Sequence, residues 1–140
     1  MYLEDSQNNE LAIWRKANQI HCWFVNNVQN GVDDGQCYEV SIEQIKKLLM
    51  ICKVVKKRCE FVVLEKSKNN IFSNLRENGY SITFKDTVYA ELLLPTMEGF
   101  FFGRTNYDEY YFKNIQDTID QLEIVIKNYN GERMYYRAWW

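Results

Sequence analysis

A repeat of apolar residues near the C-terminus constrains the fold of this chain most strongly. Its members recur at intervals of three and four residues: Tyr111, Ile115, Thr118, Leu122, Val125 and Tyr129. That spacing places them on one face of an α-helix, and such a face requires an apolar partner surface. Asn106, with Glu109 three residues later, has the spacing of a helix-capping pair. We therefore predict a helix over about 107–128 that packs against a hydrophobic core.

A second amphipathic segment begins at Ser41, where Gln44 completes a capping box. Its apolar stripe comprises Ile45, Leu48, Leu49, Cys52, Val55, Cys59, Val62 and Val63. The opposite face carries six cations: Lys46, Lys47, Lys53, Lys56, Lys57 and Arg58. The pattern predicts a helix over 41–64, whose basic face is either a solvated surface or a contact for an acidic partner or phosphates.

The N-terminal part of the chain also has a helical period. Leu11, Trp14, Asn18, His21, Val25 and Val28 recur at three and four, which predicts a helix over about 9–30 with Gly31 as its C-cap. A second apolar stripe includes Ile20 and Phe24. A helix that is apolar over so much of its surface is either central to the core or in contact with a partner, such as a second copy in a homodimer.

The remaining segments favour strands and turns. Tyr80, Ile82 and Phe84 alternate as strand residues do, and Met134–Trp140 is rich in aromatic residues suited to a strand. We expect this terminal strand to pair with Gly99–Gly103. The fold class predicted for residues 1–140 is a single, predominantly helical α+β domain, with three main helices and a small antiparallel sheet.

Composition excludes several classes of function. The 17 basic and 19 acidic residues give a net charge of −2, which disfavours non-specific binding to DNA. The four cysteines lack the paired spacing of a zinc site, so neither a metal nor a cofactor is expected. The sequence contains no leader-like or membrane-spanning stretch, and we expect reduced thiols, with Cys52 and Cys59 in the core.

An aromatic block between Gly99 and Phe112 is the most unusual local feature. It packs seven aromatic rings into fourteen residues and includes Arg104 and Asp108. Rings at this density are found in cores, in protein interfaces and in sites that stack a planar ligand. The residue types leave these three alternatives open.

Three functional hypotheses use this block or the N-terminal helix. In the first, Phe101, Tyr107, Tyr110 and Trp140 join Arg104 in an anchor cluster for a protein partner. In the second, Arg104, Lys16 and Arg15 hold phosphates, Trp14 or Tyr107 stacks a base, and Asn18 or Asp108 reads its edge. The third is catalysis by His21, the one side chain that titrates naturally near neutral pH. The candidate binding residues are Trp14, Arg15, Asn18, His21, Phe101, Arg104, Tyr107, Asp108, Tyr110 and Trp140.

The catalytic hypothesis has the weakest support from the sequence. Cys22 adjoins His21, but adjacent residues of a helix point about 100° apart, so the two cannot form a nucleophile–base pair. A lone histidine on an apolar face is also most often a hydrogen-bonded core residue. No sequence motif of a hydrolase or a nucleotide-hydrolysing enzyme is present.

Several blocks at both ends of the chain resemble one known family. They are Trp14–His21, Trp23–Val25, Val28–Asp34, Leu93–Thr96, Gly99–Gly103, Tyr107–Phe112 and Tyr136–Trp140. Together they resemble a family of small accessory proteins of tailed bacteriophages that has no assigned enzymatic activity. Residues 53–89 do not match that family's shorter middle, which indicates an insertion.

The resemblance implies phage origin and a location in the host cytoplasm. Phage biology, rather than composition, then suggests a protein that counteracts host antiviral defence. The leading expectation is an anti-CRISPR-type inhibitor that binds a host nuclease or ribonucleoprotein complex. The alternatives are a protein that sequesters a nucleotide signal and, third, a small hydrolase.

Overall fold

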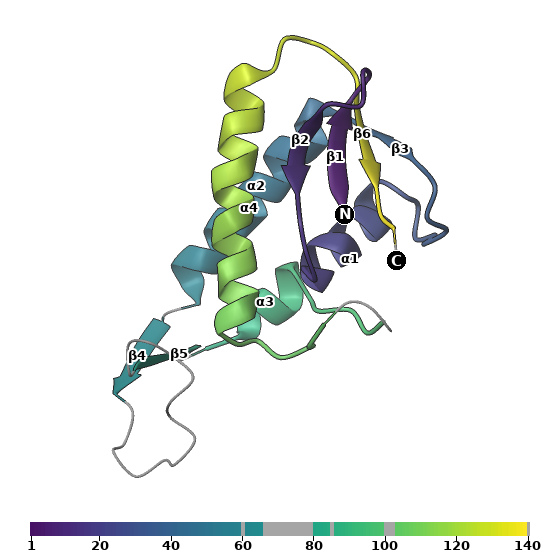
Figure 1. Cartoon of the computed structure of the whole chain (residues 1–140). Coiled ribbons are helices and arrows are strands. Elements are labelled where there is room, and N and C mark those ends of the chain that lie inside the picture. Colours follow the sequence, from purple (N-terminus) through teal and green to yellow (C-terminus); the bar gives the residue numbers. More distant parts are fainter. Residues whose placement is uncertain (60, 66–79, 85, 100–102, 140) are drawn as a thin grey trace.

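The computed structural model describes residues 1–59, 61–65, 80–84, 86–99 and 103–139 (Figure 1). A four-stranded antiparallel sheet is covered by helices, and a separate two-stranded antiparallel sheet extends from the helical side. The elements, in chain order, are β1 (Tyr2–Asp5), β2 (Glu10–Ile13), α1 (Asn18–Asn27), β3 (Tyr38–Val40), α2 (Ile42–Arg58), β4 (Phe61–Glu65), β5 (Tyr80–Phe84), α3 (Val88–Leu93), α4 (Glu109–Asn128) and β6 (Met134–Arg137).

The larger sheet has the strand order β2-β1-β6-β3, which brings the two ends of the chain together. β1 and β2 form a hairpin, and the Asp5 carboxylate stabilises its turn by accepting hydrogen bonds of 2.8 Å from the backbone amides of Gln7 and Asn9. β6 pairs with β1 on one side and with β3 on the other. Strand β6 therefore has both of its edges occupied.

One face of this sheet forms the core. Leu3 of β1 and Met134 and Tyr136 of β6 are buried, while their neighbours along the strands are only partly covered. This alternation is the period of a half-buried strand. Helices α1, α2 and α4 complete the same apolar cluster, and α2 packs along α4 (Figure 1).

The fold class is the predicted one, a small single-domain α+β fold with four described helices and a four-stranded antiparallel sheet. The capping box of α2 is present: the Ser41 side chain accepts from the Gln44 amide, and the Gln44 side chain accepts from the Ser41 amide. Cys52 and Cys59 are buried free thiols, as expected.

Three predictions about these elements were wrong. The helix expected over 9–30 spans only Asn18–Asn27, because residues 10–13 bond to β1 as a strand. Its C-cap is Val28, three residues before Gly31. The helix expected over 41–64 ends at Arg58, and Phe61–Glu65, rich in β-branched and aromatic residues, forms strand β4.

The third error concerns strand pairing. The terminal strand was expected to pair with Gly99–Gly103, but β6 already pairs with β1 and β3. Residues 100–102 lie outside the described part of the chain. Much of the predicted insertion at 53–89 also lies there, so the insertion stays a prediction.

Candidate functional site: a basic cleft at the start of helix α4

A cleft of about 370 Å³ lies where the β2–α1 connection meets the segment that leads into α4. The β2–α1 connection contributes Arg15 and Lys16, and the segment before α4 contributes Gly103, Arg104 and Asp108. The floor and sides are completed by helical residues: Gln19, Tyr110, Tyr111 and Asn114. The volume lies within the range of small-molecule sites, roughly 300–1,000 Å³.

The backbone is strained at Lys16, where the β2–α1 connection meets the segment before α4. Its φ is +57°, in the left-handed region, where the described part of the chain has only two other non-glycine residues, both asparagines. Asparagine tolerates this region, whereas lysine does so at a cost of about 1–2 kcal/mol. Gly103 packs directly against it: a Cβ built there would lie 3.3 Å from Lys16 Cβ. Glycine thus permits the close approach, and strain of this kind gathers at functional sites.

Buried amide side chains of α1 fix the other wall of the cleft. Asn18 Nδ2 donates to the backbone carbonyl of Arg104 at 2.9 Å, and Asn18 Oδ1 accepts from the Met97 amide at 3.3 Å. Gln19 Nε2 donates to the carbonyl of Tyr111 at 3.2 Å. Both residues are almost fully buried, so Asn18 fixes the backbone at Arg104 and Gln19 fixes the backbone at Tyr111.

The electrostatics of the cleft are positive. Arg15, Lys16 and Arg104 line it, and no carboxylate of the described residues lies within ion-pair distance of any of them. Among the described lining residues the one carboxylate is that of Asp108, whose Oδ1 accepts from the amides of Tyr110 and Tyr111 as the N-cap of α4. Three cations therefore face one acid that is already committed to capping, which suits an anionic ligand.

An aromatic ring stands in the same cleft. Tyr110 is the second residue of α4, and 57% of its surface is exposed. Tyr111 and Tyr136, in contrast, are buried in the core. An exposed ring beside arginines is the combination that binds a planar base together with its phosphate. The site thus carries a group complementary to each part of a nucleotide: a ring that can stack on the base, and cations that can bind the phosphate.

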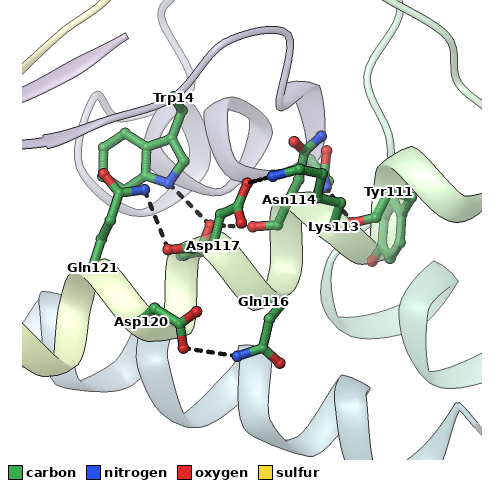
Figure 2. Close-up of polar contacts among 10 residues, drawn as sticks. Trp14, Tyr111, Lys113, Asn114, Gln116, Asp117, Asp120 and Gln121 are labelled. Carbon is green, nitrogen blue, oxygen red and sulfur yellow. Dashed lines mark hydrogen bonds and ion pairs between the residues drawn. The ribbon is translucent and has the colours of Figure 1, made fainter.

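Trp14 is an internal anchor rather than a stacking surface, and Figure 2 shows its indole directed toward α4. It is buried, and its indole Nε1 donates to Thr118 Oγ1 of α4 at 2.9 Å. Gln121 accepts from the Ile13 amide at 2.8 Å and so fastens the end of β2 to the same helix. These contacts hold the β2–α1 connection against α4, and they place Arg15 at the cleft.

His21 is a core residue in the structure. It is fully buried, with Nδ1 at 2.7 Å from the Tyr136 hydroxyl and Nε2 at 3.1 Å from a carboxylate oxygen of Asp33. Asp33 acts on His21 through this close contact and through its charge. Burial lowers the pKa of His21, and Asp33 offsets part of that shift. His21 is therefore neutral at pH 7 and connects the 31–35 turn to the sheet.

The aromatic anchor cluster is not assembled within the described residues. Tyr107 packs its ring 4.9 Å from that of Tyr111, and its hydroxyl accepts from the Thr96 amide. Phe101 and Trp140 lie outside the described part of the chain. Of the ten candidate residues, Arg15, Arg104, Asp108 and Tyr110 line the cleft, while Trp14, Asn18 and His21 lie in the interior.

Five lining residues were absent from the set of candidate binding residues: Lys16, Gln19, Gly103, Tyr111 and Asn114. Lys16 entered only as a possible phosphate ligand, and its left-handed conformation has no signature in the sequence. Gln19 and Asn114 were not singled out, because a polar residue beside a helical stripe looks like ordinary surface. The sequence does contain one indication of the site. Arg15 and Lys16 directly follow Trp14, and a buried tryptophan holds the two cations after it at the surface.

No family model, curated protein or solved structure matches the chain. Within the described ranges, none of the helices combines the length and hydrophobicity that crossing a bilayer requires.

Proposed function

We propose that this protein is a phage accessory protein that counteracts host defence by sequestering a nucleotide in the cleft between the β2–α1 connection and α4. The ligand class is a phosphorylated compound with a planar ring. Arg15, Lys16 and Arg104 hold its phosphate, and Tyr110 stacks on its base. Asp108 and Asn114 stand on the same wall, where polar groups fix orientation.

The observation that supports this proposal is the convergence of three cations from two distant segments beside an exposed tyrosine. Such a collection of like charges disfavours folding unless an anion neutralises it. The segments are nevertheless tied together by buried hydrogen bonds at Asn18 and by the strained backbone at Lys16. A binding role accounts for both the charge and the strain.

A stoichiometric binder fits this arrangement better than an enzyme. The described lining residues include no histidine or cysteine, and their one carboxylate, that of Asp108, accepts from two backbone amides. Binding without turnover is also what sequestration requires.

The anti-CRISPR-type inhibitor remains the alternative. Its anchor cluster comprises Phe101, Tyr107, Tyr110 and Trp140 with Arg104. Phe101 and Trp140 lie outside the described residues, and Tyr107 packs against α4 instead of facing outward. The cleft therefore favours the nucleotide hypothesis over this one.

Equilibrium dialysis against a panel of linear and cyclic mono- and dinucleotides tests the proposal. We expect saturable binding of at least one member, and a loss of at least about ten-fold in affinity in Arg104→Ala, because hydrogen bonds to charged groups contribute about 1.5–3 kcal/mol. Lys127→Ala is the matched control, since Lys127 is an exposed cation at the far end of α4.

Two results would contradict the proposal. One is the absence of saturation by every nucleotide at millimolar concentration. The other is an equal loss of affinity in Arg104→Ala and Lys127→Ala, which would mean that binding depends on the overall surface charge and not on the cleft. Retention of the wild-type circular dichroism spectrum in both variants ensures that the comparison concerns binding alone.

A further inference from the structure

A second surface feature lies between α2 and the C-terminal part of α4. It is a shallow groove of about 520 Å³. Its floor is apolar and consists of Leu49, Met50 and Val54 from α2 and Ile126 from α4. Met50 is 59% exposed, which is unusual for a methionine on a helix that has a core to pack against.

Lysines form the rim of this groove. Lys46, Lys53 and Lys57 recur along the same face of α2 as the apolar floor, and no carboxylate is among the lining residues. Lys46 and Lys53 have exposed acidic partners, Glu43 at 3.0 Å and Glu123 at 2.5 Å. For Lys57, no ion pair occurs with any described residue. Exposed pairs of this kind contribute little and exchange readily for a new partner.

An adjoining hollow extends the basic strip toward the start of α4. It shares Lys53 and Lys57 with the groove and adds Lys56, which donates to Gln116. The lysines all belong to α2, and the α4 side of the hollow carries two carboxylates. The lysine face of α2 is locally basic in a chain whose net charge is −2.

We propose that the α2–α4 groove is a docking site for an acidic amphipathic helix of a protein partner. The apolar floor would receive the hydrophobic stripe of that helix, and the lysine rim would meet the carboxylates beside the stripe. This is the helix-in-groove mode of recognition, in which apolar side chains at positions i, i+3, i+4 and i+7 of the partner helix enter the groove. From Lys46 to Lys57, α2 rises by about 17 Å, so a partner helix of roughly eleven to fourteen residues spans the groove.

The shape of the surface favours a helix over a membrane. Ile126 of α4 lies beside the α2 residues, so the apolar floor spans a shallow groove between two helices rather than the convex face of one. A planar lipid surface contacts a convex amphipathic helix and leaves a groove unfilled. Methionine on the floor also suits a peptide groove, because its flexible side chain adapts to different apolar anchors.

This docking site is independent of the nucleotide cleft. None of the residues that line the groove lines the cleft. The failure of either proposal therefore leaves the other intact.

Fluorescence anisotropy with a designed peptide tests the docking site. The probe is a labelled helical peptide of about fourteen residues that carries leucines at i, i+4, i+7 and i+11 and glutamates beside them. We expect saturable binding that weakens as salt is raised, and no saturation by a glutamine-for-glutamate peptide or by one with the same residues in scrambled order. Met50→Glu should weaken binding at least ten-fold.

The chain offers matched control variants for this experiment. Ile124 is also 59% exposed on a helix but lies outside the groove, so Ile124→Glu should leave the affinity unchanged. Lys57→Glu should weaken binding, whereas Lys113→Glu, at an exposed lysine near the other end of α4, should not.

Several outcomes would overturn the proposal. They are no saturation by the acidic peptide, equal losses in Met50→Glu and Ile124→Glu, or tight binding of the scrambled peptide. Binding of anionic vesicles that Met50→Glu abolishes, without peptide binding, would assign the surface to lipid instead. Concentration-dependent dimerisation that Met50→Glu abolishes, again without peptide binding, would assign it to a second copy of the chain.

Discussion

Replacing Lys16 by glycine should make the protein more stable and a weaker binder. Lys16 has a φ of +57°, a conformation that costs a residue with a Cβ about 1–2 kcal/mol, whereas glycine adopts it freely. Glycine also gains more entropy in the unfolded chain, worth about 0.5–1 kcal/mol, so the expected net gain in the free energy of unfolding is about 0.5–1 kcal/mol. For a chain of 140 residues this corresponds to a rise of roughly 2–4 °C in Tm.

The same substitution removes one of the three cations of the cleft. Losing a charge-assisted contact to a phosphate should weaken nucleotide binding at least about ten-fold. Thermal unfolding followed by circular dichroism measures the first effect, and equilibrium dialysis measures the second. Lys16 would then lower the stability of the protein but contribute to binding, a trade-off that is common among residues of functional sites.

Lys16→Ala separates the two contributions. Alanine keeps the Cβ, so the backbone strain remains, but the ammonium group is lost. Binding should fall as in Lys16→Gly, with no gain in Tm. The reasoning is refuted if Lys16→Gly lowers Tm, because the left-handed conformation would then carry no strain, or if both variants bind as the wild type does.

Three further predictions concern the scaffold. Gly103→Ala should lower the free energy of unfolding by about 1–2 kcal/mol in a urea titration, because φ is +82° and the new Cβ would press on Lys16. Tyr136→Phe should cost about 1–3 kcal/mol, since it leaves the buried Nδ1 of His21 without a partner while the ring still stacks on Phe24. Burial lowers the pKa of His21, so the unfolded chain binds a proton at a higher pH than the folded chain does. The free energy of unfolding should therefore fall as the pH is lowered below about 6.5. In His21→Gln, this pH dependence of the free energy of unfolding should be reduced.

The sequence predicted the parts of the fold that depend on local chemistry. The capping box at Ser41 and the apolar period after Tyr111 correctly located α2 and α4. Residues 10–13 were misassigned because Leu11 and Trp14 continue the spacing of the following helix, while their actual partner, β1, is specified by a turn at Asp5. Long-range pairing outweighed the local period there.

The candidate site was predictable in composition but not in geometry. Arg15 and Arg104 were singled out as phosphate contacts and Tyr110 as an anchor for a protein partner, and all three line one cleft. Their neighbours Trp14 and Asn18 were grouped with them, yet their side chains point inward to hold the walls in place. Adjacent residues of a connection face opposite ways, and the direction of each depends on contacts with α4 that a single sequence does not reveal.

The measurement that tests the central claim most directly is a titration of the isotope-labelled protein with the nucleotide panel, followed by heteronuclear NMR of the backbone amides. The account predicts saturable shifts centred on Arg15, Lys16, Gly103, Arg104 and Tyr110, and their loss in Arg104→Ala. An absence of shifts at millimolar nucleotide, or shifts confined to the lysines of α2, would contradict the assignment of the cleft as a nucleotide site.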